Sequence, residues 1–213
     1  MALTLLLILV QIIISTCNLT RAATLPNFTS ILIFGDSTVD TGNNNFINTF
    51  FKGNHLPYGQ NVTSHIPTGR FSNGKLIPDF VASFLGIKQT VPPSLDPNLS
   101  DDDLRTGVSF ASAGSGYDVL TTVVTNVIPV SKQLDQFKSY KANLSRIVGN
   151  TEAKNIIQKS LVVISAGTND FGFNYYLLPF RRAQFDVSSY QDFLQKAIQD
   201  YVKVISKPLQ KAI

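Results

Sequence analysis

A short apolar stretch, Ser30-Ile31-Leu32-Ile33-Phe34, ends at Gly35 and decides the fold. A continuous apolar run of this length is typical of a strand that is buried on both faces of a sheet. Leu161-Val162-Val163-Ile164-Ser165 repeats the pattern, and Gly107-Val108-Ser109-Phe110-Ala111 is a weaker third candidate. We therefore expect three strands in one sheet.

Amphipathic helices are predicted between and after these strands, because apolar residues recur there at steps of three and four. The expected helices cover residues 74–85, 134–148, 150–157 and 189–207. Asn73 is the predicted cap of the first helix, Ser189 begins the last, and Pro208 ends it. Apolar strands separated by such helices indicate an α/β fold, in which a parallel sheet is covered on both faces.

The composition favours one globular domain and excludes several function classes. Of 213 residues, 44% are apolar and 15% are charged, which suffices for a substantial core. The net charge is +4, but the basic residues are scattered, so nucleic acid is not an expected partner. One cysteine and two histidines cannot build a disulfide framework or a Cys/His zinc site. We expect neither a metal nor a cofactor.

The N-terminus resembles a secretory signal. Residues 3–14 are apolar except for Thr4 and Gln11 and are too few to span a bilayer, and small residues follow around Arg21. This pattern predicts a signal peptide over residues 1–22 and a single domain over residues 27–213, with no stable membrane span. The alternative is a buried N-terminal helix. Glycosylation sequons, each of which could also stay unused, lie at Asn27, Asn61, Asn98 and Asn143.

Polar residues follow each predicted strand, where the reactive groups of parallel sheets gather. Ser37 comes just after the first strand, at the expected start of a helix, and suits a nucleophile or an ordinary helix cap. Asn169, after the strand at 161–165, could donate its side-chain N–H to the same oxyanion, or could be a turn residue. Gly114 and Gly116 permit a close backbone approach or make a tight turn.

Four ordered blocks carry a family resemblance. They are Gly35-Asp36-Ser37 with Asp40, Gly42, Asn43 and Asn44, then residues 68–80, then residues 110–116, and finally Gly167-Thr168-Asn169-Asp170. Together they resemble the plant GDSL esterase/lipase family of the SGNH-hydrolase superfamily. Thr38 stands where the Gly-Asp-Ser-Leu motif that gives the family its name has leucine. Plant members vary at this position.

The resemblance implies a flavodoxin-like, three-layer α/β/α sandwich with a parallel sheet. It also implies hydrolysis of lipid or other carboxylic esters through a serine acyl-enzyme, without a cofactor. Ser37 matches the nucleophile, and the backbone of Ser37, the backbone of Gly114 and the side chain of Asn169 match the oxyanion hole. A shifted alignment would match Gly116, instead of Gly114, to the oxyanion hole. The implied location is extracellular, in the cell wall or apoplast.

The family's Asp-x-x-His block, which activates the serine, has no match among these residues. His55 and His65 lie in a loop-like stretch and are interpreted as surface residues. The family's strand order is 2-1-3-4-5, and we expect strands 4 and 5 to be missing. The strand at 161–165 would then be an exposed edge that drives instability or self-association. This chain is therefore expected to be close to inactive.

Several other functions compete with ester hydrolysis. A non-catalytic secreted protein that binds esters or glycans, and a truncated gene product without activity, remain alternatives. Residues 107–111 imitate a nucleophile elbow but lie within a predicted strand. Residues 69–75 come within one residue of a phosphate-binding loop, although Leu76 replaces the required hydroxyl residue. Asp101-Asp102-Asp103 lacks the spacing of a calcium loop and is interpreted as a solvated loop.

Overall fold

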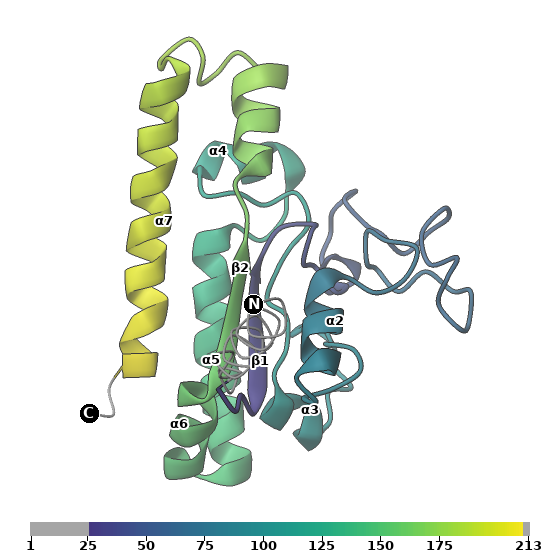
Figure 1. Cartoon of the computed structure of the whole chain (residues 1–213). Helices are drawn as coiled ribbons and strands as arrows, with labels where there is room; N and C mark the ends of the chain where they lie inside the picture. The colour runs from purple at the N-terminus through teal and green to yellow at the C-terminus, as the bar shows by residue number, and fades with distance from the viewer. Residues whose placement is uncertain (1–25, 211–213) are drawn as a thin grey trace, which may run out of the picture.

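A computed structural model describes residues 26–210; the predicted signal peptide lies outside them. Figure 1 shows the arrangement of the helices and strands. In chain order these are β1 (Ser30–Gly35), η1 (Asn43–Phe46), α2 (Ile77–Phe84), α3 (Asp101–Thr106), α4 (Val119–Thr125), α5 (Val130–Val148), α6 (Asn150–Gln158), β2 (Ser160–Ser165), η2 (Asp170–Leu177) and α7 (Val187–Gln210).

The two strands β1 and β2 are parallel and pair from Ser30 with Ser160 to Gly35 with Ser165. Residues 107–111 run along the opposite edge of β1, where the Phe110 N–H donates to the Ile33 carbonyl at 2.7 Å. The order across the sheet is therefore 107–111, β1, β2, which agrees with the order predicted for the first three strands.

The prediction of a regular strand at residues 107–111 is wrong, because this segment forms only single bridges at Ser109. Two features keep its pairing with neighbouring segments short. Gly107 ends α3 with a φ of 96°, which turns the chain just before the segment. On its outer side lie Pro92 and Pro93, which have no N–H to extend a ladder.

Helices cover both faces of the sheet, which gives three layers (Figure 1). Side chains alternate along β1, so Leu32 and Phe34 pack on one face against α5, α6 and α7. Ile31 and Ile33 point to the other face and pack with Ala82 of α2. The α/β sandwich with a parallel sheet is thus confirmed. Its central strand is fully buried, as the sequence predicted.

The outer strand β2 is less protected than β1. Residues 161–165 are partly exposed, whereas every residue of β1 is buried. Among the described residues, β1 is the only strand that pairs with β2. The edge of β2 away from β1 therefore has backbone groups that no described strand pairs.

Helix boundaries differ from the predicted ones because the caps are different residues. The Asp79 carboxylate accepts a hydrogen bond from the Leu76 N–H at 2.9 Å, so α2 begins at Ile77 and Asn73 is not its cap. Asp186 caps α7 by accepting from the Ser189 N–H at 2.7 Å, and α7 begins at Val187. The predicted end at Pro208 is also wrong, because the helix continues through its last part-turn to Gln210.

The three aspartates at 101–103 begin a helix, so their interpretation as a loop is wrong. Ser100 Oγ accepts from the Asp103 N–H at 3.1 Å, and the Asp103 carboxylate accepts from the Ser100 N–H at 3.2 Å. This reciprocal cap begins α3, and the acidic residues of its first turn suit the positive end of the helix dipole.

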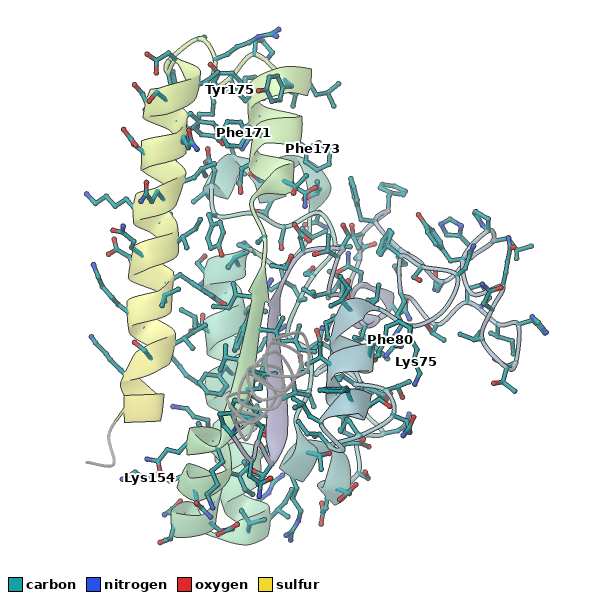
Figure 2. All side chains as sticks on the ribbon, viewed as in Figure 1. Lys75, Phe80, Lys154, Phe171, Phe173 and Tyr175 are labelled. Atoms are coloured by element: carbon teal, nitrogen blue, oxygen red, sulfur yellow. The ribbon has the colours of Figure 1, made fainter. Side chains whose placement is uncertain are left out.

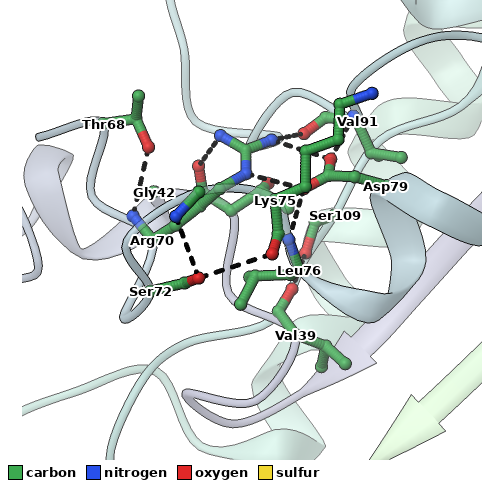
Figure 3. A network of polar contacts seen from close by, with 12 residues as sticks. Val39, Gly42, Thr68, Arg70, Ser72, Lys75, Leu76, Asp79, Val91 and Ser109 are labelled. Atoms are coloured by element: carbon green, nitrogen blue, oxygen red, sulfur yellow. Dashed lines mark hydrogen bonds and ion pairs between the residues drawn. The ribbon is translucent and has the colours of Figure 1, made fainter. Parts of the chain in front are cut away.

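A buried ion pair holds the long segment between η1 and α2 to the body of the protein (Figure 3). Arg70 donates to both carboxylate oxygens of Asp79, at 2.8 and 2.9 Å, and also to the Val91 carbonyl. Asp79 is fully buried and accepts further from the N–H groups of Leu76 and Val91. Every partner is satisfied, as a buried charge requires.

Asp79→Ala should lower the free energy of unfolding by about 3–5 kcal/mol, because it leaves the Arg70 charge buried and unpaired. Chemical denaturation with a fixed m-value measures this change. The matched control is Asp135→Ala, which removes an exposed ion pair with Lys138 and should cost less than about 1 kcal/mol. Equal losses in the two variants would contradict the importance assigned to the buried pair.

Candidate active site

Ser37 lies in a turn directly after β1. The N–H groups of Val39 and Asp40 both donate to the Asp36 carbonyl, at 3.2 and 2.9 Å, and no helix begins there. The predicted helix start at Ser37 is therefore wrong, and a helix dipole gives Ser37 no assistance. The Asp40 carboxylate binds the N–H groups that follow and directs the chain into a loop. Within the described residues, neither the N–H nor Oγ of Ser37 forms a hydrogen bond.

The carbonyl of Gly35 joins two loops. The first loop follows β1 and contains Ser37, and the second loop contains Gly114. The Gly35 carbonyl accepts hydrogen bonds from the Ser112 N–H at 3.0 Å, from Ser115 Oγ at 2.8 Å and from Gln133 Nε2 at 2.8 Å. The Gly35 N–H donates to Gln133 Oε1, so this one side chain of α5 pairs with both backbone groups of Gly35. Gly114, between Ser112 and Ser115, is thereby held beside the end of β1.

The side chain of Asn169 joins the third loop, which follows β2, to the second loop. Its Nδ2 donates to the Ser115 carbonyl at 2.9 Å. A side-chain amide has two N–H donors, so the second can serve another acceptor. The structure thus brings Ser37, Gly114 and Asn169 to the same end of the sheet, although no contact joins Ser37 directly to the other two.

The two candidate glycines have different surroundings. Gly114 has a φ of 85°, and its N–H has no acceptor among the described residues. A side chain at Gly116 would come within 2.2 Å of the Asp170 carboxylate, so Gly116 allows close packing. This difference favours Gly114 as the oxyanion donor and gives Gly116 a structural role.

A buried polar network, which sequence reasoning missed, supports the Ser37 loop. Asp40 accepts from the N–H groups of Gly42, Asn43 and Ala113 at 2.7–2.9 Å. Asn43 Nδ2 donates to the carbonyls of Ser109 and Ala111, and Asn44 Nδ2 to those of Phe51 and Ala113. Burial raises the pKa of Asp40 to about 6, and the N–H donors only partly offset this effect.

A second buried carboxylate fixes the third loop. Asp170 accepts from the N–H groups of Tyr117 and Asp118 and from Thr121 Oγ1. Burial raises the pKa of Asp170, and these hydrogen bonds lower it less than burial raises it. These contacts fix the chain that follows Gly116, and the hydrogen bond from Asn169 to the Ser115 carbonyl fixes the chain before it.

The neighbouring Asp118 is paired instead with a cation. Its two carboxylate oxygens accept from Arg181 at 2.7 and 2.9 Å, and one accepts from the Tyr190 hydroxyl. Burial alone would raise the pKa of Asp118, but the Arg181 guanidinium and the other donors hold it below its ordinary value.

The two histidines do not join the site. Both are exposed, and their Nδ1 atoms contact nearby carbonyls of their own loop, His55 that of Leu56 and His65 that of Gln60. This loop projects away from the sheet in Figure 1. Their interpretation as surface residues is confirmed.

The competing motifs have structural roles. Ser109, the centre of the elbow-like sequence, is completely buried and donates to the Val39 carbonyl at 3.0 Å. The sequence at 69–75 precedes α2 without a strand before it, and its Arg70 belongs to the ion pair with Asp79. Over residues 26–210, no cluster of three potential metal-ligating side chains occurs. No helix in that range is long and apolar enough to cross a membrane.

Comparison with known proteins identifies the family. Residues 31–208 match the sequence model of the GDSL-like Lipase/Acylhydrolase family. The chain belongs to this family. It is 55% identical over 176 residues to GDSL esterase/lipase At1g06990 of Arabidopsis thaliana, which covers 83% of the chain and 49% of that relative.

Two further Arabidopsis thaliana relatives extend the match to the family. GDSL esterase/lipase At2g31540 is 51% identical over 205 residues, which are 95% of the chain and 57% of that relative. GDSL esterase/lipase At5g45960 is 47% identical over 197 residues, which are 91% of the chain and 52% of that relative. The chain thus spans about half the length of these GDSL relatives. No solved structure matches it.

Asp40→Asn should lower the free energy of unfolding by about 1–3 kcal/mol, because an amide NH₂ would face one of the N–H donors that the carboxylate now accepts. The raised pKa of Asp40 gives this loss a pH dependence. Protonation of Asp40 stabilises the fold most below pH 3.8, and this contribution is lost as the pH rises through about 6. The difference between wild type and variant should therefore shrink over that window.

Urea denaturation at a series of pH values measures this difference. Each unit by which the pKa of Asp40 in the folded state exceeds its value in the unfolded state contributes about 1.4 kcal/mol to the pH-dependent change in the free energy of unfolding. The exposed Asp192→Asn is the control and should stay within about 0.5 kcal/mol of wild type. A difference for Asp40→Asn that grows with rising pH would show the opposite linkage.

Proposed function

We propose that the protein hydrolyses carboxylic esters, with lipid esters among the candidates, through a serine acyl-enzyme at Ser37. Membership of the GDSL family and the names of the relatives support this function. The observation that carries it is the hydrogen bond from Asn169 Nδ2 to the Ser115 carbonyl. Through it, all three loops at the carboxyl end of the sheet meet beside a serine whose hydroxyl and N–H have no partner among the described residues.

In the proposed reaction, Ser37 Oγ attacks the ester carbonyl carbon and its proton passes to the departing alcohol. The bond between the acyl carbon and the alcohol oxygen breaks, and an acyl-enzyme remains. Water then attacks the same carbon, releases the acid and restores the serine. In both steps the carbonyl oxygen becomes negative, and the Ser37 N–H, the Gly114 N–H and Asn169 Nδ2 stabilise it.

Ser37 also needs a base to accept its proton. Among residues 26–210, no side chain accepts a hydrogen bond from Ser37 Oγ, and both histidines are bound within their own loop. This observation favours a second candidate function, in which the site binds an ester or a glycan without cleaving it. External imidazole can replace a missing histidine as proton acceptor, which separates the two functions.

Labelling by an ethyl fluorophosphonate with imidazole present, followed by mass spectrometry, should modify Ser37. Ser37→Ala should abolish this labelling. Asn169→Ala should slow it by about 10²–10³-fold, because one donor to the phosphoryl oxygen is lost. The control is Asn48→Ala, which alters an exposed amide outside the site and should retain the wild-type rate.

A loss of less than tenfold in Asn169→Ala would remove Asn169 from the oxyanion hole. If esters bind but imidazole produces no labelling at Ser37, the binding function replaces hydrolysis. Circular dichroism of each variant separates a local effect from unfolding.

We further propose that the mature protein is a secreted glycoprotein of the cell wall or apoplast. The four sequon asparagines, Asn27, Asn61, Asn98 and Asn143, are all exposed, which supports their accessibility to glycosylation. The single domain over residues 27–213 also stays a prediction.

We also propose that β2 mediates self-association. Its outer edge has no partner strand among the described residues, and its side chains at 161–164 are apolar and partly exposed. Such an edge is a template for pairing with a second copy of the chain.

Val163→Lys should reduce this self-association, because a charge on an edge strand opposes pairing. Sedimentation velocity over a range of concentrations measures the change. Val187→Lys alters an exposed valine outside β2, at the start of α7, and should associate like wild type. A wild-type chain that stays monomeric throughout and unfolds cooperatively would rule out this role for β2.

A further inference from the structure

A pocket of about 450 Å³ lies between α5 and the segment that leads into α3. From α5 it is lined by Gln136, Tyr140 and Asn143, among others, which share one face of the helix because they are four and seven residues apart. The opposite wall consists of residues from the segment 94–99 and of Leu104 in α3. The volume lies within the range of about 300–1,000 Å³ that is typical of ligand sites.

The lining of this pocket combines the two kinds of surface that a sugar ring needs. Leu99, Leu104 and Val108 supply apolar surface for the C–H groups of a ring. Ser139 supplies a hydroxyl, and the Asp96 carboxylate, which accepts one hydrogen bond from the Asn98 N–H, has further lone pairs for sugar hydroxyls.

One polar atom of the lining residues has no partner. Gln136 Oε1 is buried and accepts no hydrogen bond from the described residues. A buried acceptor that stays unpaired costs free energy, and such groups are rare in folded proteins. An N–H donor on a ligand in the pocket would satisfy this oxygen.

Asn143 lies on the same face of α5, is exposed, and begins the sequon Asn143-Leu144-Ser145. Its side chain is oriented by Arg146, whose Nη2 donates to Asn143 Oδ1 at 3.3 Å. Asn143 Nδ2, the atom to which an N-linked sugar is attached, has no partner among the described residues. The other three sequon asparagines do not line this pocket.

The larger groove between α5 and α6, of about 740 Å³, suits a neutral sugar less well. Its lining includes Lys141, Arg146 and Lys154, and Figure 2 labels Lys154 at the end of the molecule where α6 lies. A neutral sugar would cover these cations without pairing them, which costs free energy. The pocket beside Asn143 is therefore the better match.

We propose that this pocket holds the first two sugars of an N-linked glycan on Asn143, and that Gln136 Oε1 accepts a hydrogen bond from an acetamido N–H of these N-acetylglucosamine units. Gln136 and Asn143 are seven residues apart, about 10 Å along the helix, which two linked sugar rings can span. The inference rests on the proposed secretion of the protein and is independent of the chemistry at Ser37.

In the modification itself, Asn143 Nδ2 forms a bond to C1 of the first sugar. The bond between C1 and the diphosphate of a lipid-linked sugar donor breaks, the lipid diphosphate leaves, and Nδ2 loses one proton. The Asn143 amide thus becomes the stem of the glycan, and the pocket fixes the sugars that follow.

The protein secreted by a plant cell line tests the inference. Mass spectrometry of its glycopeptides should find a glycan on Asn143. Ser145→Ala removes the hydroxyl that the sequon requires, whereas Ser145→Thr keeps it. Thr63→Ala removes the exposed sequon at Asn61, outside the pocket, and is the matched control.

Gln136→Leu should then have opposite effects on the two forms of the protein. With the glycan on Asn143, it should raise the unfolding equilibrium constant by about two- to tenfold, because a hydrogen bond to the sugar is lost. In the Ser145→Ala background it should lower this constant or leave it unchanged, because an unpaired buried acceptor is removed. Urea denaturation measures both changes.

The controls locate the effect at Asn143. In the Thr63→Ala and Ser145→Thr backgrounds, Gln136→Leu should raise the unfolding constant as it does in the wild-type background. An unmodified Asn143, or the same effect of Gln136→Leu with and without the glycan, overturns the inference. Neither result bears on the labelling of Ser37, so failure here is distinct from failure of the proposed hydrolysis.

Discussion

The carbonyl of Gly35 is the point on which the candidate site depends. It stands at the end of the buried strand β1 and accepts from Ser112, Ser115 and Gln133. A side chain at residue 35 would overlap the Ser165 carbonyl, at 1.9 Å, so only glycine lets β2 approach this closely. Ser37 follows two residues later, and the loop that carries Gly114 is fixed by the same carbonyl. One acceptor therefore sets the position of the first two loops, and the Asn169 amide adds the third.

Four polar side chains of the family blocks hold the loops in place. Asp40, Asn43 and Asn44 use their side chains on backbone groups of the first two loops. Asp170 does the same for the third. These side chains are buried and satisfied, whereas Ser37 and the Gly114 N–H have no partner among the described residues. A rigid buried network around a few unpaired donors is the arrangement expected of a preorganised oxyanion site.

The sequence predicts the buried strand, the α/β layers and the end of the sheet where the site lies, because these follow from apolar periodicity and strand polarity. It also contains the signal for α3, since Ser100 and Asp103 have the spacing of a capping box. It does not predict Gln133, which lies 98 residues from Gly35 and looks like any polar residue of a helix. The turn at Ser37 is equally hidden, because the Asp40 carboxylate competes with a helix for the backbone N–H groups that follow.

A crystal structure of the protein with Ser37 phosphonylated would test directly whether the three donors converge on one oxygen. One phosphoryl oxygen should accept hydrogen bonds from the Ser37 N–H, the Gly114 N–H and Asn169 Nδ2, each at about 2.7–3.1 Å. Donors that lie more than about 8 Å apart, too far to share one oxygen, would contradict this convergence.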